Sequence, residues 1–444
     1  MTKLISFITV LVVIANTQSF AKAKKVPVTC IHALTQDPND FDGSAVALCF
    51  EQLEEPNAEF QCSLMTSMPH YKRMIGRHCK KLGFGNKHKG MYRQLLSEYL
   101  AGSNRQESIP AGETPLTFAA RNGDAGKVAE LIENKTDVNK KNKEGDTALI
   151  LASCAGSIDA VKLLLDAKAD VHAKNKDGVP ALYCACRQGS VEIVKLLLEA
   201  KADINARDRN GNTALIDVLN SEEISVEIVR TLIGANAHVN AKDNDGITAL
   251  IICAASGHTE AANILIEAKA DVNVKDKLGN TALAHASSKG HVEIVRMLIT
   301  AKVDLSGRIK DGRTPLIIAA KENHIAIVKL LISAGADLEA KEMHGNTALS
   351  IAGAEGHLEV VRLLIASKAD VNSKNTTGTT VLMGASFRGR ADVVKALLDA
   401  NAEINAKNKH GETALKIARD TMKIASVEQL PQVIELLQAA GGKE

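Results

Sequence analysis

The amino-terminal part of the sequence contains the thiols best placed for covalent chemistry. Between residues 24 and 108 the cysteines are Cys30, Cys49, Cys62 and Cys79. A segment of this size buries only a small core, and small domains of exported proteins are commonly held by disulfide bonds. We therefore predict two disulfides among these four thiols, for which three pairings are possible.

A zinc site is the alternative chemistry for this segment. Its imidazole ligands would come from His32, His70, His78 or His88. Structural zinc sites usually take two thiolates from a Cys-x-x-Cys pair, and the segment has no such pair. Because this ligand spacing is missing, zinc is the less favoured interpretation, and we predict no metal ion or other cofactor for this chain.

The remaining cysteines and the evenly spaced histidines lack catalytic partners in the sequence. The four later cysteines are expected at or beside small buried positions, as reduced core residues; they are Cys154, Cys184, Cys186 and Cys253. A bridge between Cys154 and Cys186 is the alternative. One histidine recurs every 33 residues, as is typical of a structural helix start, at His258, His291, His324 and His357. No nucleophile–base pair, phosphate loop or His-x-x-x-His spacing accompanies them, so we predict no enzymatic activity.

The first 23 residues have the organisation of a secretory signal peptide. Lys3 gives a basic start, an apolar stretch runs from Leu4 to Ala15, and small residues offer cleavage after Ala21 or Ala23. An uncleaved anchor is the alternative, but about 12 apolar positions are fewer than the roughly 17 to 25 that span a bilayer. We expect an exported protein, periplasmic or secreted, without stable membrane insertion once the signal is cleaved.

Charge and composition restrict the class of partner. The chain has 54 basic and 52 acidic residues and a formal net charge of +2, so no global field would hold it on nucleic acid, and no nucleic-acid partner is expected. Hydrophobic residues make up 45% of the chain but aromatic residues only 3%. A core of Ala, Leu, Ile and Val suits closely packed helices.

The elements that would position these side chains recur along most of the chain. Tripeptides related to Thr-Ala-Leu begin at Thr114, Thr147, Pro180, Thr213, Thr248, Thr281, Thr314, Thr347, Thr380 and Thr413. A glycine stands two residues before each of them, which predicts a turn with positive φ. The threonine can then cap a helix, and Pro or Ala fits the first turn of that helix.

A second helix is expected in each unit. After a glycine such as Gly189, the run from Val191 to Leu198 has the helical period and an apolar face. The unit ends in Ala202-Asp203-Ile204-Asn205, whose polar side chains can satisfy turn backbone groups. Each unit is thus predicted to contain a helix, a turn, a second helix and a long loop.

These residues resemble the ankyrin repeat in period, in Gly-x-Thr-Pro/Ala-Leu, in the glycine break and in Ala-Asp-Val-Asn. The resemblance implies an all-α solenoid of ten helix-turn-helix repeats with β-turn fingers over residues 111–440, the last repeat being a carboxy-terminal cap. A small helical segment, 24–108, precedes it behind the signal peptide, 1–23. The expected molecule is an elongated monomer.

One irregularity interrupts the repeats. The step from Thr213 to Thr248 is 35 residues rather than 33, and the glycine break is missing near Ser221. We expect a local distortion of the stack there. The family's histidine after the tripeptide leucine is also absent, which removes a hydrogen-bond network common in the family.

Residues that depart from the repeat pattern on turn tips and first helices are the candidates for partner contact. Apolar residues at turn tips are Val179, Ile247 and Leu278, and the candidates on first helices are Tyr183, Arg187, Phe387 and Arg388. Aromatic and arginine side chains are frequent anchors of protein interfaces. Packing against a neighbouring turn is the alternative role for each.

The resemblance implies a non-enzymatic protein–protein interaction scaffold, which the signal peptide would place in the cell envelope or outside the cell. The alternative is that the repeats are the targeting arm of a small catalytic, metal-binding or polyanion-binding head. In residues 24–108 an acidic run from Asp37 to Glu59 precedes a basic run from Lys72 to Arg93. The basic run favours polyanion binding, whereas ordinary solvated helix faces would explain both runs.

Overall fold

The computed structural model describes residues 109–221, 224–424 and 427–444. The chain divides into two units, 1–108 and 109–444, and only the second is described below. The expected signal peptide, the segment 24–108 and the four cysteines predicted to form disulfides all lie outside the described residues. Those predictions stay predictions.

The described residues form twenty α-helices and no strand. The helices are α7 (Pro115–Arg121), α8 (Ala125–Glu133), α9 (Ala148–Ala155), α10 (Ile158–Asp166), α11 (Ala181–Gln188), α12 (Val191–Glu199), α13 (Ala214–Leu219), α14 (Val226–Gly234), α15 (Ala249–Ser256), α16 (Thr259–Glu267), α17 (Ala282–Lys289), α18 (Val292–Thr300), α19 (Pro315–Lys321), α20 (Ile325–Ser333), α21 (Ala348–Glu355), α22 (Leu358–Ala366), α23 (Val381–Phe387), α24 (Ala391–Asp399), α25 (Ala414–Ile424) and α26 (Leu430–Ala439).

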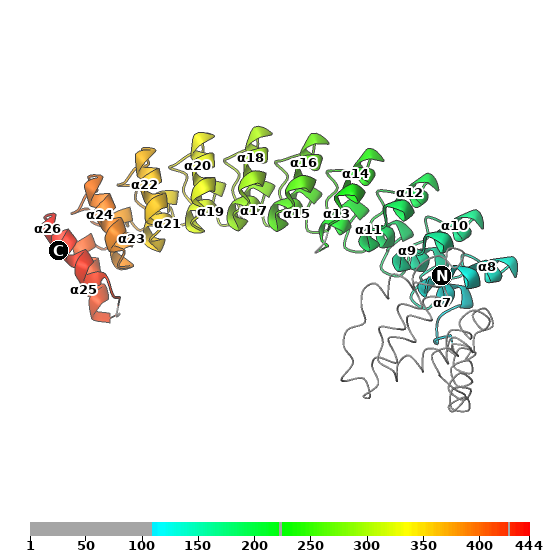
Figure 1. Ribbon diagram of the computed structural model, residues 1–444. Coiled ribbons are helices and arrows are strands. Elements are labelled where there is room, and N and C mark those ends of the chain that lie inside the picture. Colours follow the sequence, from blue (N-terminus) through cyan, green and yellow to red (C-terminus); the bar gives the residue numbers. More distant parts are fainter. Residues whose placement is uncertain (1–108, 222–223, 425–426) are drawn as a thin grey trace, which may run out of the picture. The chain divides into compact units, whose positions relative to one another are not determined.

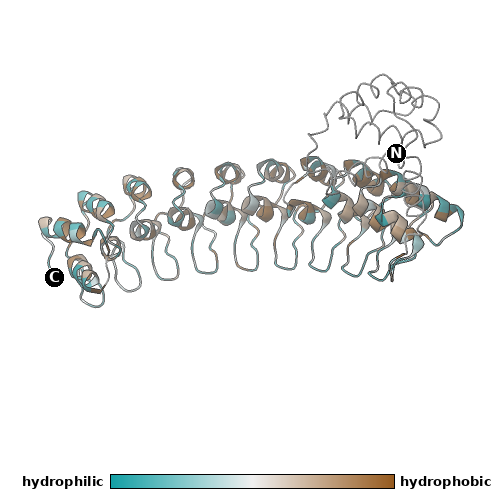
Figure 2. Ribbon diagram, turned by 60° about the horizontal axis from the view of Figure 1, so that its bottom comes forward, coloured by the Kyte–Doolittle hydropathy of each residue, from teal (hydrophilic) through white to brown (hydrophobic). Residues whose placement is uncertain are grey.

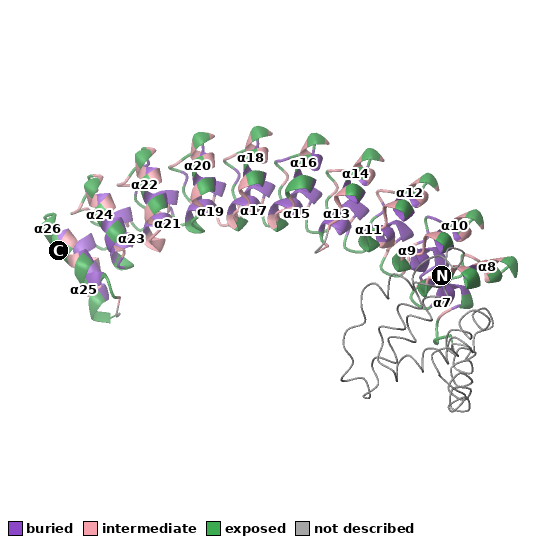
Figure 3. Cartoon of the chain, viewed as in Figure 1, coloured by how far each residue is buried: buried purple, intermediate pink, exposed green. Residues whose placement is uncertain are grey.

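Consecutive helices pair, and the ten pairs stack side by side in the second unit. The first helices of the pairs, α7 to α25, form one row and contact their neighbours in that row, and the second helices, α8 to α26, form the other (Figure 1). The buried residues lie between and within the rows, while the outward sides of the helices are exposed (Figure 3). The expected all-α stack of ten helix pairs is confirmed for the described residues.

Small and branched apolar residues build the core, as the composition indicates. The leucine of every tripeptide is at most 4% exposed, and Ala152 and Ala185, three residues further on, are fully buried. Because these alanines are small, neighbouring first helices such as α9 and α11 pack closely. Each pair therefore buries its apolar face against the next pair, as expected for a repeat protein.

Local sequence sets the helix ends. Thr147 has an extended backbone and its hydroxyl accepts a hydrogen bond from the Ile150 N–H, which caps α9. The same helix ends at Gly156, whose φ of 71° is left-handed. At the start of α12 the Ser190 hydroxyl accepts from the Ile193 N–H. The helix-capping role predicted for the threonine of the tripeptide is confirmed at Thr147, and the Ser190 cap was not predicted.

The loops between repeats project from the helices as fingers (Figure 2). Asn175 shapes one finger, since its Oδ1 accepts from the N–H groups of Asp177 and Val179 at 3.0 and 2.9 Å. One backbone hydrogen bond links neighbouring fingers, as from the Lys176 N–H to the Glu144 carbonyl at 3.1 Å. Backbone hydrogen bonds thus connect neighbouring fingers, and this holds the side chains of the finger row in fixed positions.

The two extra residues near Ser221 shorten one helix. α13 ends at Leu219 after six residues, whereas the other first helices have seven or more. α14 nevertheless begins normally, because the Ser225 hydroxyl accepts from the Ile228 N–H. α13 still packs against α11 and α15, so the irregularity is local to the connection.

The finger glycines differ in which atoms an added side chain would contact. Substituting two of them therefore tests how closely neighbouring fingers pack. A Cβ on Gly345 would lie 2.8 Å from the backbone nitrogen of Thr376, whereas a Cβ on Gly411 would meet nothing within 4 Å. Both have left-handed φ values, +79° and +76°. We expect Gly345→Ala to destabilise the protein by about 1–3 kcal/mol more than Gly411→Ala, because only the former also forces neighbouring fingers apart. Denaturant unfolding of the two variants checks this; equal losses would contradict it.

Candidate functional site

The first helices and the fingers present one continuous surface, here called the inner surface, on the inside of the curved row of repeats (Figure 1). The second helices face the other way. Ion pairs between exposed side chains of neighbouring second helices, such as Lys162 with Glu192 at 2.8 Å and Arg230 with Glu260 at 3.0 Å, cover that opposite side. The large apolar side chains that are exposed in the described repeats lie on fingers or first helices, namely Leu278, Met343, Phe387, Met422 and Ile424. The inner surface is therefore the candidate site.

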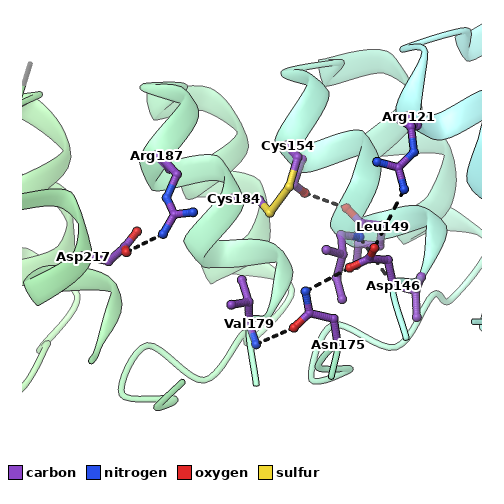
Figure 4. Close-up of a disulfide and its surroundings, with 12 residues drawn as sticks. Arg121, Asp146, Leu149, Cys154, Asn175, Val179, Cys184, Arg187 and Asp217 are labelled. Atoms are coloured by element: carbon purple, nitrogen blue, oxygen red, sulfur yellow. Dashed lines mark hydrogen bonds and ion pairs between the residues drawn. A yellow bond between two sulfur atoms is a disulfide. The ribbon is translucent and has the colours of Figure 1, made fainter. Parts of the chain in front are cut away.

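A disulfide crosses the inner surface between two repeats. It joins Cys154 of α9 to Cys184 of α11, whose Cα atoms are 4.4 Å apart (Figure 4). Cys154 is exposed and Cys184 is half-buried. The prediction that these two cysteines are reduced core residues is therefore wrong. The alternative bridge is also wrong in its partner, since Cys154 pairs with Cys184 and not with Cys186.

Cys186 and Cys253 are core residues, as predicted. Both are free thiols and are 2% and 0% exposed. Burial raises the pKa of Cys253 to about 12 and also raises that of Cys186, where the nearby Asp217 carboxylate adds to the effect. Neither thiol is accessible or ionised at neutral pH, so neither is a nucleophile.

Beside the disulfide, an exposed arginine pairs with a buried carboxylate. Arg187 Nη2 lies 2.7 Å from Asp217 Oδ1, and the two side chains are 66% and 9% exposed (Figure 4). The hydrogen bond to Asp217 raises the pKa of Arg187. Asp217 Oδ2 is buried and has no hydrogen-bond partner in the part of the chain that the structure describes. A buried carboxylate with one unsatisfied oxygen is costly and is uncommon in a packed repeat.

Tyr183 does not belong to the accessible surface, which corrects its assignment as a partner-binding candidate. It is 1% exposed, and its hydroxyl donates to the backbone carbonyl of Asn212 and lies 3.4 Å from that of Ala206, both in the next finger. Burial raises the pKa of this phenol far above its ordinary value. The residue after the tripeptide leucine faces the neighbouring finger, so an aromatic ring there joins two repeats.

The other candidates differ in accessibility. Leu278 at a finger tip and Phe387 at the end of α23 are 58% and 51% exposed, and Arg388 is exposed beside Phe387. Val179 and Ile247 are half-buried against the fingers. The structure leaves these five and Arg187 able to reach solvent, and their role in binding stays a prediction.

Four large apolar residues that are exposed in the described part of the chain were not predicted: Ile109, Met343, Met422 and Ile424. Met343 lies at the finger tip before Gly345 and is 64% exposed. An apolar residue at a finger tip, the signal that identified Leu278, would have found it. Met343 extends the exposed apolar residues of the inner surface by two repeats from Leu278 towards Phe387.

A polar cluster occupies the inner surface at the first repeat. The Glu113 carboxylate accepts hydrogen bonds from Arg121 at 2.5 Å and from Thr117 at 2.6 Å, and Asn142 of the next finger donates to it at 3.2 Å. Partial burial raises the pKa of Glu113, but these hydrogen bonds outweigh it and lower the pKa overall. The polar groups satisfy one another, so the cluster holds two fingers together.

The evenly spaced histidines are structural, as predicted. They are the N-cap residues of α16, α18, α20 and α22. His324 Nε2 lies 3.1 Å from the Ser288 carbonyl and His357 Nε2 lies 2.9 Å from the Lys321 carbonyl, each in the preceding repeat. His291, His324 and His357 therefore link successive repeats through backbone carbonyls.

Among the described residues no group of three or more His, Cys, Asp or Glu side chains is arranged to hold a metal ion. None of the described helices has the length and hydropathy that crossing a membrane requires.

Stacked helix pairs with a continuous exposed row of first helices and fingers define a helical-repeat solenoid, a class whose architecture presents an extended surface. Comparison with protein families identifies the repeat family to which the chain belongs. Models of ankyrin repeats in three copies match residues 84–175, 167–243, 220–308 and 301–375, and a model of many copies matches 364–418. The chain belongs to the ankyrin-repeat family. No curated protein sequence matches it.

Ankyrin repeats are in general protein–protein interaction scaffolds, and ankyrin-repeat proteins are in general non-enzymatic. The partners of this chain are accordingly expected to be proteins.

Proposed function

We propose that this chain is an exported interaction scaffold that binds a protein partner on its inner surface, in the cell envelope or outside the cell. The observation that carries the proposal is that the large apolar side chains exposed in the described repeats lie on fingers and first helices. Leu278, Met343 and Phe387 are each more than half exposed there. Exposed apolar and aromatic side chains next to arginine are typical of interface anchors.

Two features support an exported location. The first 23 residues have the pattern of a signal peptide. The Cys154–Cys184 disulfide is of a kind that persists mainly in oxidising compartments. The expected mature protein begins after Ala21 or Ala23 and is recovered from the periplasmic or secreted fraction. Amino-terminal sequencing of that fraction checks this, and an intact Met1 in the cytosol would contradict it.

The binding surface is tested by capture with matched variants. The immobilised mature protein is incubated with envelope or secreted extract, and retained proteins are quantified. Combined replacement of Leu278, Phe387 and Arg388 by alanine is expected to lower retention of a specific partner at least about tenfold, because such anchors carry most of an interface's free energy.

The control variant carries Arg230→Ala and Lys329→Ala, which remove exposed cations from the second helices. It should retain the partner as the unchanged protein does. Equal retention by both variants would place binding elsewhere.

Polyanion or metal binding by the amino-terminal segment, residues 24–108, is the second candidate function. The separation of its acidic and basic residues into two runs favours polyanion binding. The basic run from Lys72 to Arg93 contains no acidic residue. If it binds a polyanion, the mature chain should be retained on immobilised heparin and residues 109–444 alone should not. Identical elution of the two would leave the basic run without this role. Metal retention by the same two chains decides the zinc alternative.

A further inference from the structure

The Cys154–Cys184 disulfide lies where a reductant can reach it. Cys154 is exposed on α9, and both cysteines line a shallow hollow with Val179, Arg187 and Gln188. The free thiols in the described part of the chain, Cys186 and Cys253, are both buried. Thiol–disulfide exchange requires direct access of a thiolate to one sulfur atom. The inner surface thus exposes a covalent link between the second and third repeats.

The two sulfur atoms are chemically unequal. Cys184 is the fourth residue of α11, near the positive end of that helix. Arg187 lies on the same helix three residues further on and lines the same hollow, with its guanidinium paired with Asp217. A helix amino terminus and a neighbouring guanidinium both stabilise a thiolate. Cys154 is the penultimate residue of α9, near the negative end, where a thiolate is disfavoured.

We propose that this disulfide is a reversible exchange site for thiol reductants, with Cys154 as the sulfur attacked and Cys184 as the leaving thiolate. An incoming thiolate bonds to Cys154 Sγ as the bond between the two cysteine sulfurs breaks, and Cys184 departs with the electron pair. A second thiol, as thiolate, then attacks the reductant's sulfur in the mixed disulfide and releases Cys154. Two thiols become one disulfide, and their two protons are taken up by the two cysteines.

Opening the bond changes the surface rather than the fold. α9 and α11 also pack through buried residues, including Leu149 and Leu182, which are 0% and 1% exposed. The same hollow reaches Arg187 and Val179, two of the candidates for partner contact. Reduction therefore frees two thiols and loosens one cross-link within the inner surface while the stack stays folded.

The first test counts thiols on the folded mature protein by alkylation and peptide mass analysis. As isolated, Cys154 and Cys184 should resist alkylation. After treatment with dithiothreitol both should be labelled, while Cys186 and Cys253 stay unlabelled and the far-ultraviolet circular dichroism is unchanged. Labelling of Cys154 and Cys184 in the untreated protein, or reduction only after unfolding, would overturn the proposal.

The second test uses glutathione, a monothiol, to identify the sulfur attacked. Acid-trapped mixed disulfide should be found on Cys154 in preference to Cys184. Arg187→Gln should slow reduction about threefold or more, because a less stabilised thiolate leaves more slowly, and Arg187→Lys should retain most of the rate.

Arg313→Gln, which removes another arginine paired with an aspartate, is the matched control, and it should reduce at the unchanged rate. Glutathione on Cys184, or equal rates for the two glutamine variants, would refute the assigned roles. Because no binding partner is needed, these results are independent of the proposed scaffold function.

Discussion

Replacing Leu283 by alanine is expected to destabilise the protein by about 3–4 kcal/mol, since a fully buried leucine loses both its transfer free energy and its packing. Leu283 is 0% exposed in α17, near the middle of the stack. Each helix pair is stabilised mainly by its neighbours, so a weak central repeat also uncouples the two halves. Denaturant unfolding followed by circular dichroism should show a lower midpoint and a broader or two-step transition.

Leu278→Ala is the control for that change, because Leu278 stands five residues earlier in the same repeat region and is 58% exposed. Its removal should alter the free energy of unfolding by less than about 0.5 kcal/mol. A similar loss for both variants would mean that Leu278 packs into the stack, and it would then cease to be a candidate for partner contact.

The sequence was sufficient to predict the fold because the same local instructions recur in every repeat. A glycine that needs positive φ, a threonine that caps and a leucine that is buried act within a few residues of one another. Gly345, Thr347 and Leu349 do in one repeat what Gly279, Thr281 and Leu283 do in another. Each of these local preferences is weak in a single repeat, but its recurrence at the same position in every repeat makes it recognisable.

The features that sequence reasoning missed depend on register between repeats. Cys154 and Cys184 are separated by 30 residues, which places Cys184 in the repeat that directly follows. Within that repeat Cys184 stands about one helical turn before the position equivalent to Cys154. Cys186 is nearer to the equivalent position, yet it lies on the buried side of α11. Tyr183 was misplaced for the same reason, because its contact is with the next finger. Such contacts become predictable only once the stacking geometry is known.

The Arg187–Asp217 pair should respond to substitution with opposite signs. Asp217 stands six residues after its finger glycine, and the equivalent residues Ile252 and Ile318 are buried isoleucines, 7% and 5% exposed. Asp217→Ile should therefore stabilise the protein by about 1–2 kcal/mol, since it replaces a poorly satisfied buried carboxylate with a side chain that the position accommodates elsewhere.

Arg187→Ala should instead destabilise the protein by about 1–2 kcal/mol. It leaves the buried carboxylate without its hydrogen bond, and the expected loss is moderated because Arg187 is itself largely exposed. The double variant should behave as Asp217→Ile does, because without the carboxylate the arginine has nothing to neutralise. Thermal and denaturant unfolding of the three variants measure these differences.

The three results together distinguish an ordinary surface ion pair from one that is retained at a cost in stability. If Arg187→Ala has no effect, water satisfies Asp217 and the pair is an ordinary surface interaction. If Asp217→Ile destabilises the protein, the carboxylate contributes to the packing of α13. The expected signs mean that the pair is retained at a cost in stability, as occurs where side chains serve binding more than folding. The pair adjoins the exposed disulfide, so that outcome would favour the surface of the second to fourth repeats as part of the binding site.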